Sequence, residues 1–268
     1  MFEKLYRDMH AVPREGDYQG VDDLLYCGKC QTQRECYIML QDGRKICKPI
    51  PCQCEREEER KYQERRDREA FQDRVNELRK QGVTDEAYTR QTFLTDDNRN
   101  PQVTDKCSRY VDRWDEMKQK CYGMVLFGGV GGGKSFYACC IANALIDKGV
   151  KVLVTRLSDL VRYRIQQTPN PINLGDFELI VLDDIGVESA TQTAYSIVDD
   201  IYRARIPLIV TTNLSLAQLK DKQQEIARQR IYDRIIERAV IDVFVDVRRS
   251  RLDIAREKSR HAHEVLNR

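Results

Sequence analysis

The sequence lacks a long hydrophobic run, a secretory signal and a large net charge. No apolar stretch in its 268 residues approaches the roughly 18 residues that a membrane span needs. Residues 1–6 include acid and lack a signal-peptide core, which predicts a cytoplasmic protein with no membrane contact. The net charge is only +2, so nucleic-acid binding would have to come from a local basic patch rather than from the field of the whole molecule.

Histidine is also scarce, whereas cysteine is abundant. Of the three histidines, His10 has no assigned role, and the other two lie on a polar tail where solvated residues are expected. Six of the ten cysteines fall within the first 54 residues, and without a secretory signal such a cluster favours metal binding over disulfides. These six are Cys27, Cys30, Cys36, Cys47, Cys52 and Cys54.

The spacing of these cysteines predicts a tetrahedral zinc site. Cys27-x2-Cys30 is a common zinc knuckle, and Cys52-x-Cys54 supplies a second, less usual pair of thiolates. Cys47 could replace one of the late pair, while Cys36 looks peripheral. A redox role for the first pair is the alternative, although no thioredoxin-like strand surrounds it.

Composition divides the chain into three regions. We expect a zinc-binding domain over residues 1–54, a charged linker helix over 55–84 and an α/β domain over 85–268. The linker has opposite charges at i,i+4 spacing, and Gly82 is expected to stop it. Its apolar stripe, Phe71, Val75 and Leu78, either packs at one end of the helix or docks a partner helix.

From about residue 85, strand and helix patterns alternate, which predicts a three-layer αβα fold with a central parallel sheet. Ser135 and Ser158 stand where helix N-caps are expected. The expected strands are residues 123–127, 150–155, 179–182, 208–212 and 240–245. The expected helices are residues 104–120, 135–148, 158–166, 190–204, 223–236 and 254 onward.

One segment predicts a phosphate-binding loop. Gly, four free positions and then Gly-Lys-Ser follow a short apolar strand and precede an apolar helix. Glycines let backbone N–H groups surround a polyphosphate, and the helix N-terminus adds positive charge. Lys134 is expected to reach the β and γ phosphates of ATP, and Ser135 to ligate Mg²⁺. The predicted loop comprises Gly128, Gly129, Val130, Gly131, Gly132, Gly133, Lys134 and Ser135.

Two apolar strands end in polar residues that complete this prediction. Asp183 is placed to hold Mg²⁺, and Asp184 to orient or deprotonate the attacking water. The second role is often filled by Glu in related ATPases, so the shorter acid favours slow hydrolysis. Asn213 could bond the water or the γ-phosphate, although an ordinary turn asparagine has the same pattern.

Two groups of arginines are candidate contacts to partners. One helical face carries Arg230, Arg234 and Arg238. These arginines either supply an arginine finger for a neighbouring subunit's ATP or form a solvated row. Basic and aromatic side chains, the combination that binds single-stranded DNA, stand together at Arg162, Tyr163 and Arg164. The alternative is that these residues form the outer face of an amphipathic helix.

Taken together, these residues resemble the DnaC/DnaI-type bacterial replicative helicase loaders, which are AAA+ ATPases. The resemblance covers nearly the whole chain. It is carried by the loop, by Leu182-Asp183-Asp184-Ile185-Gly186, by Thr211-Thr212-Asn213-Leu214 and by Arg230-Ile231-Tyr232-Asp233-Arg234.

The resemblance implies residue roles. It places the arginine finger on Arg234, favours Cys27, Cys30, Cys52 and Cys54 as zinc ligands, and makes residues 162–164 the element that faces DNA. It also implies an ATPase domain without a C-terminal lid. Gly132 departs from the family's usual Thr, and Arg248, Arg249 and Arg251 could contact nucleotide or a neighbouring subunit.

The implied function is ATP-dependent loading of a hexameric replicative helicase. ATP would drive self-association through the ATPase domain and closure on single-stranded DNA, with Mg²⁺ and Zn²⁺ as cofactors. Two alternatives stay open, namely an IstB-type transposition helper with the same ATPase motifs, and an adaptor that binds ATP with little hydrolysis.

Overall fold

The computed structural model describes residues 9–166, 172–186, 192–223, 225–245 and 251–266. The chain divides into two compact units, Met1–Gln72 and Asp73–Arg268, and the division falls inside helix α1 (Gln53–Gly82). Within the described residues, no helix has both the length and the apolar character that crossing a membrane requires.

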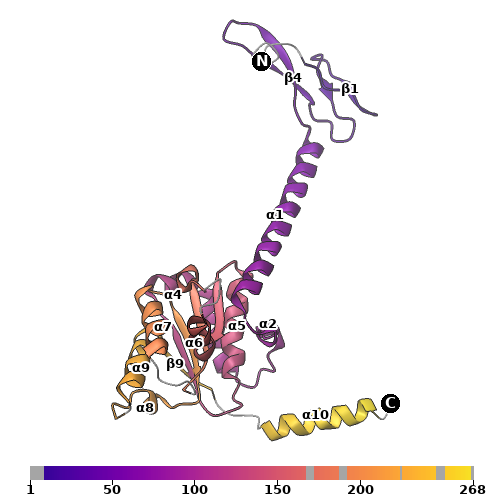
Figure 1. Cartoon of the computed structure of the whole chain (residues 1–268). Coiled ribbons are helices and arrows are strands. Elements are labelled where there is room, and N and C mark those ends of the chain that lie inside the picture. Colours follow the sequence, from indigo (N-terminus) through magenta and orange to yellow (C-terminus); the bar gives the residue numbers. More distant parts are fainter. Residues whose placement is uncertain (1–8, 167–171, 187–191, 224, 246–250, 267–268) are drawn as a thin grey trace. The chain divides into compact units, whose positions relative to one another are not determined.

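The first unit is built on two antiparallel hairpins (Figure 1). The strands are β1 (Tyr18–Gln19), β2 (Leu25–Tyr26), β3 (Glu35–Met39) and β4 (Lys45–Pro49). Among the described residues of the hairpins and their loops, Leu24 and Ile46 are the buried aliphatic side chains, together with three cysteines. This unit therefore has little apolar core of its own.

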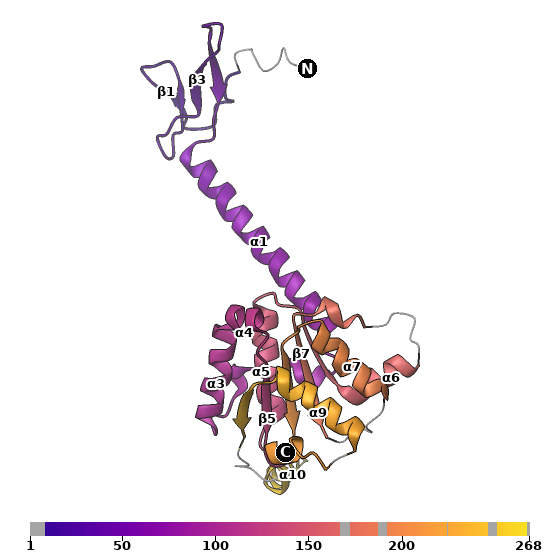
Figure 2. The same cartoon turned by 90° about the vertical axis from the view of Figure 1, so that its left-hand side faces the viewer.

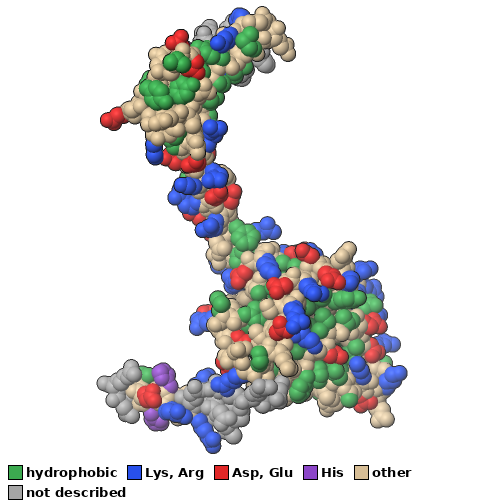
Figure 3. Space-filling model, turned by 180° about the vertical axis from the view of Figure 1, so that it is seen from behind, with side chains coloured by type: hydrophobic (Ala, Val, Ile, Leu, Met, Phe, Trp, Pro, Cys, Tyr) green, Lys and Arg blue, Asp and Glu red, His purple; other side chains and the backbone are tan. Residues whose placement is uncertain are grey.

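Helix α1 is 30 residues long, and most of its side chains are exposed. Acidic and basic side chains are intermixed along its exposed stretch (Figure 3). Near its end, Val75 and Leu78 pack into the core of the second unit, while Phe71 is exposed, so most of the predicted stripe is covered within the chain. The helix ends at Gly82, where a Cβ atom would lie 1.9 Å from the carbonyl oxygen of Val152.

The second unit contains a five-stranded parallel sheet in the order β6-β7-β8-β5-β9. Two of its strands, β5 and β7, are labelled in Figure 2. The predicted α/β class with a central parallel sheet is confirmed. Its strands are nearly continuous apolar runs, as expected for a sheet covered on both faces. They are β5 (Met124–Phe127), β6 (Val152–Arg156), β7 (Leu179–Ile185), β8 (Leu208–Thr212) and β9 (Ile241–Phe244).

Alternate strand residues point into two separate cores, one on each face of the sheet. One core joins the sheet to the end of α1 and to α2 (Glu86–Thr89), α3 (Pro101–Asp112), α4 (Trp114–Lys120) and α5 (Lys134–Asp147). The other joins it to α6 (Leu157–Ile165), α7 (Gln192–Arg203), α8 (Leu216–Leu219) and α9 (Ile226–Arg238). Two 3₁₀ turns, η2 (Phe93–Thr95) and η3 (Leu174–Asp176), and helix α10 (Arg251–Leu266) complete the described elements.

Several element boundaries differ from the prediction. The helix expected over 104–120 is two helices, because the chain breaks at Arg113, and the first of them starts earlier at Pro101. Neither serine is an N-cap: Gly133 caps α5 and Arg156 precedes α6. In the first case the left-handed Gly133 leads directly from the loop into the helix, which places Lys134 in the first turn. The first two residues of the helix expected over 190–204 lie outside the described residues.

Candidate functional sites

The predicted phosphate loop connects β5 to α5. Three of its glycines have positive φ, with Gly128 at 143°, Gly131 at 89° and Gly133 at 94°, a region that side chains disfavour. A Cβ on Gly128 would also lie 2.3 Å from the carbonyl oxygen of Val245 on the neighbouring strand's end. Glycine is therefore required by both backbone geometry and space. The loop forms the open turn at a helix N-terminus that polyphosphates occupy.

Lys134 and the two polar strand ends come together beside this loop. The Lys134 ammonium donates to the carbonyl oxygens of Gly128, at 3.1 Å, and Gly129, at 2.8 Å, and to Asn213 Oδ1, at 2.8 Å. Asn213 Nδ2 in turn donates to Asp184 Oδ1, at 3.2 Å. One asparagine thus bridges the cation expected to bind phosphate and the carboxylate expected to prepare water.

Asp183 and Asp184 lie in a bulge of β7. Leu182 pairs with Val210 and Ile185 with Thr212, so β7 has one residue more than β8 between these pairs. Such bulges redirect side chains near active sites. Asp183 is buried, and its carboxylate accepts hydrogen bonds from Thr211 Oγ1, at 2.6 Å, and from the Tyr88 hydroxyl, at 2.8 Å. Asp184 has the left-handed φ of 60°, and its amide donates to Thr211 Oγ1 at 2.8 Å.

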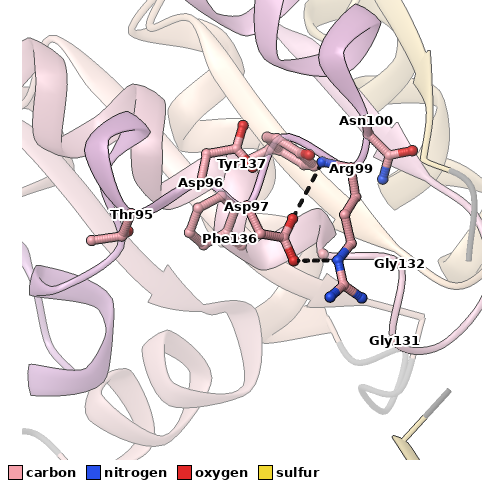
Figure 4. Close-up of a pocket in the computed structure, with 10 residues that line it drawn as sticks. Thr95, Asp96, Asp97, Arg99, Asn100, Gly131, Gly132, Phe136 and Tyr137 are labelled. Atoms are coloured by element: carbon pink, nitrogen blue, oxygen red, sulfur yellow. Dashed lines mark hydrogen bonds and ion pairs between the residues drawn. The ribbon is translucent and has the colours of Figure 1, made fainter. Parts of the chain in front are cut away.

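A pocket of about 390 Å³ opens beside the phosphate loop (Figure 4). Gly131, Gly132 and Gly133 form one wall, and Phe136 and Tyr137 of α5 supply aromatic rings. The opposite wall is the polar segment 95–100, in which Asp97 Oδ2 lies 2.7 Å from Arg99 Nε. This wall was not predicted from the sequence, although the run of Asp, Asn and Arg just before Pro101 was a possible signal.

Arg234, the predicted finger, lies on α9 and contacts its own chain. Its Nε is 3.4 Å from Asp199 Oδ1, and its Nη1 is 3.2 Å from Glu237 Oε2. The guanidinium stacks over the Tyr202 ring, with Cζ 4.2 Å from the ring centroid. Asp199 is buried, and its other oxygen accepts from Arg203 Nε at 2.7 Å. The structure thus holds Arg234 among residues of α7 and α9.

The three predicted DNA contacts lie on α6. Arg162 pairs with Asp159, and Arg164 Nη1 lies 2.9 Å from Asp200 Oδ2 on α7. Tyr163 between them is 41% exposed. Both arginines are therefore partly neutralised within the chain. Of the later arginines, Arg248 and Arg249 and the side chain of Arg251 lie outside the described residues.

The four cysteines predicted as zinc ligands converge in the first unit. The Sγ atoms of Cys27, Cys30, Cys52 and Cys54 all lie within 4.8 Å of one another. Cys54 Sγ is 3.5 Å from the Sγ atoms of both Cys27 and Cys52. Tetrahedral zinc with bonds of about 2.3 Å sets sulfurs about 3.8 Å apart, so the four thiols fit this ion.

Other polar groups close to this cluster distinguish its members. The Thr32 hydroxyl, 3.1 Å from Cys30 Sγ, lowers the pKa of that thiol to about 5, which favours the thiolate that binds metals. The contact with Cys30 raises the pKa of Cys54 to about 12. Cys47 does not join these four: it lies with His10 and Glu35, where His10 Nδ1 is 3.1 Å from Glu35 Oε1.

Comparison with known proteins gives a family match that covers most of the second unit. The family described as IstB-like ATP binding protein matches residues 59–254, more than half of the chain. A protein of Sinorhizobium fredii, provisionally named an insertion sequence ATP-binding protein, is 32% identical over 122 residues. That alignment covers 42% of this chain and 41% of the relative, so the chain spans about two fifths of the relative's length.

Solved structures show the same fold. A DnaC helicase loader matches with a TM-score of 0.50 and 16% identity, over 61% of this chain and 100% of that one. A protein of Streptococcus pyogenes serotype M3, provisionally described as a primosome component, matches with a TM-score of 0.50 and 19% identity, over 63% of this chain and 93% of that one. At these identities the likeness concerns the fold alone. The loop, the strand-end residues and the family match agree: the chain belongs to the IstB-like ATP binding protein family, with the AAA+ fold.

Proposed function

We propose that this protein is an ATP-dependent loader of a hexameric replicative helicase, which binds and hydrolyses ATP and contacts single-stranded DNA. The observation that carries this proposal is the cysteine unit. Its four converging thiols precede residue 59, where the family match begins. The ATPase motifs alone would suffice for a transposition helper. The resemblance to the loaders also includes a zinc-binding unit ahead of the charged helix. In a loader, that unit binds the helicase.

The nucleotide site supports ATP binding by the second unit. We place the triphosphate on the loop from Gly128 to Ser135 and the nucleoside in the adjoining pocket, against Phe136 and Tyr137. Mg²⁺, when bound, would neutralise phosphate charge, with Ser135 and Asp183 as its protein ligands. Phosphate oxygens would compete with Asn213 for Lys134, because an ammonium has only three protons to donate. Asn213 would then be released to orient water with Asp184, so its contacts report nucleotide binding.

A transposition helper is the second candidate, and the relative from Sinorhizobium fredii favours it. An adaptor with little hydrolysis is the third, because Asp184 is shorter than the glutamate usual in related ATPases. If the protein hydrolyses ATP in the presence of single-stranded DNA, the adaptor function is excluded. Turnover does not separate the loader from the helper, since both need the same site.

Capture of a helicase by the full-length protein separates them. With ATP present, the immobilised protein should retain a hexameric replicative helicase, and a Cys27→Ser, Cys30→Ser variant should lose this capture while still binding ATP. The loss is expected because the helicase contact depends on the cysteine unit. Cys36→Ser is the matched control, since Cys36 lies outside the four-cysteine cluster. Retention of a transposase but not of the helicase would replace loading by the helper function.

The role of Asp184 predicts a loss of turnover without a loss of binding. Asp184→Asn should lower kcat about 100-fold, as expected when a general base is removed. Asn keeps the side-chain size and tolerates the left-handed backbone, so ATP affinity should stay nearly unchanged. Phosphate release and equilibrium ATP binding measure the two effects. The control is Asp147→Asn, which replaces an exposed acidic residue of α5. An unchanged kcat for Asp184→Asn would mean that another residue activates the water.

A further inference from the structure

A buried tyrosine hydroxyl contacts the carboxylate of Asp183, the residue proposed above as a magnesium ligand. Tyr88 lies on the short helix α2, 95 residues before Asp183, and its side chain is buried. Its hydroxyl is 2.8 Å from Asp183 Oδ2, and Arg156 Nη2 lies 3.5 Å from the same hydroxyl. A guanidinium can only donate, and an ionised carboxylate can only accept. The tyrosine proton therefore points at Asp183.

The two oxygens of Asp183 are each fixed by one hydroxyl. Thr211 donates to Oδ1 and Tyr88 to Oδ2, so rotation of the carboxylate would break both hydrogen bonds. Each carboxylate oxygen has a second lone-pair position, which leaves room for a cation. An ordinary phenol has a pKa of about 10, so the Tyr88 hydroxyl carries its proton at neutral pH and donates it to Asp183.

The backbone around Tyr88 is itself anchored on two sides. Asn143 Nδ2 of α5, the helix that follows the phosphate loop, donates to the Tyr88 carbonyl oxygen at 2.8 Å. Before α2, Val83 bridges to Val154 of β6, and the Thr84 hydroxyl donates to the Val154 carbonyl oxygen at 3.0 Å. The hydroxyl is thus placed by contacts to the same helix and sheet that form the nucleotide site.

We propose that Tyr88 is a positioning residue that holds the Asp183 carboxylate in the orientation that binds Mg²⁺. The inference rests on the proposed function only in assigning Mg²⁺ to Asp183. Phenylalanine would fill the same buried space, so packing alone does not account for a hydroxyl between Arg156 and Asp183. Such partners of a ligand typically contribute about 10- to 100-fold to metal affinity or activity.

The test is the Mg²⁺ dependence of nucleotide binding by Tyr88→Phe. Calorimetric titration with the non-hydrolysable analogue AMPPNP gives its affinity in EDTA and at increasing Mg²⁺ concentrations. For Tyr88→Phe, the Mg²⁺ concentration that gives half of the maximal gain in affinity should rise about tenfold. The affinity in EDTA should equal that of the wild type, because the hydrogen bonds of the Tyr88 hydroxyl go to Asp183 and Arg156 rather than to the phosphate loop.

Tyr110→Phe is the matched control. Tyr110 of α3 is also buried, and its hydroxyl donates to the Tyr122 carbonyl oxygen at 2.7 Å rather than to a residue of the proposed nucleotide site. Each variant loses one buried hydrogen bond of about 1 kcal/mol, so both thermal midpoints should fall by a similar few degrees. Only Tyr88→Phe should change the Mg²⁺ response.

Three outcomes would overturn the inference. Equal Mg²⁺ midpoints in Tyr88→Phe and wild type would remove the positioning role and leave the proposed function intact. A weaker affinity in EDTA as well would make Tyr88 a structural residue. If the AMPPNP affinity of the wild type does not depend on the Mg²⁺ concentration, both this inference and the proposed nucleotide chemistry are overturned. Failure to capture a helicase would affect the loader proposal alone.

Discussion

Protein in which Arg234 is replaced by alanine should bind ATP normally and turn it over about 1,000-fold more slowly, the effect typical of a lost arginine finger. The partners of Arg234 in its own chain, Asp199, Glu237 and Tyr202, belong to α7 and α9 rather than to the phosphate loop. A finger acting on its own nucleotide would need a different position. We therefore expect Arg234 to leave these partners and complete the site of a neighbouring subunit. Phosphate release and ATP binding measure the two quantities.

Arg203→Ala is the matched control for Arg234→Ala. Arg203 contacts the same Asp199 carboxylate from α7, but its side chain is 77% exposed and belongs to no predicted motif. Its removal should leave turnover close to that of the wild type. A comparable loss in both variants would show that Asp199 and its arginines matter for stability instead.

Mixing two inactive variants tests whether Arg234 acts between subunits. Arg234→Ala keeps the phosphate loop, and Lys134→Ala keeps the arginine. In a mixed assembly, ATP bound by the first would face Arg234 of the second, so turnover should exceed the sum of the two separate proteins. No recovery on mixing, or a collapse of ATP affinity in Arg234→Ala, would make Arg234 a contact within its own chain.

Removal of zinc should unfold the first unit and leave the second folded. The described part of the first unit has two hairpins and almost no aliphatic core, whereas structural zinc contributes about 10–16 kcal/mol to folding in small domains. That exceeds the net stability of most small domains. Chelation should release one zinc per chain and expose the first unit to proteolysis. ATP affinity should be unchanged, because the loop lies in the other unit.

Single substitutions separate ligands from bystanders in this unit. Cys52→Ser should reproduce the effect of chelation, since Cys52 is buried in the four-cysteine cluster. Cys36→Ser should retain both zinc and protease resistance. Zinc retained by Cys52→Ser, or absent from the wild type, would contradict the assignment of these four thiols to one ion.

The fold of the second unit was predictable because its signals are local. A parallel strand covered on both faces is an apolar run, so residues 179–182 and 208–212 were recognisable without their neighbours. Ends of such strands meet at one edge of the sheet, which brings Asp184 within hydrogen-bonding distance of Asn213. The cysteine pairs were equally recognisable, because the spacing of zinc ligands is a property of the sequence itself.

What the sequence did not reveal depends on pairings between distant residues. Tyr88 meets Asp183 across 95 residues, and Arg164 meets Asp200 across 36, and no periodicity encodes either contact. Gly82 was expected to end α1, and it does, but the sequence did not show that its missing side chain also lets the backbone approach Val152. The strands β1 and β2 of the first unit have two residues each, which is too short to produce a recognisable alternation.

The bulge in β7 gives the short acid at position 184 a different meaning. Asp is among the few side chains that adopt a left-handed backbone readily, and a longer Glu would meet a cost of about 1–2 kcal/mol there. The length of the acid and the hand of the backbone are thus adapted to each other. If Asp184 prepares the water as proposed, Asp184→Glu is therefore expected to disturb the site unless the strand is straightened as well.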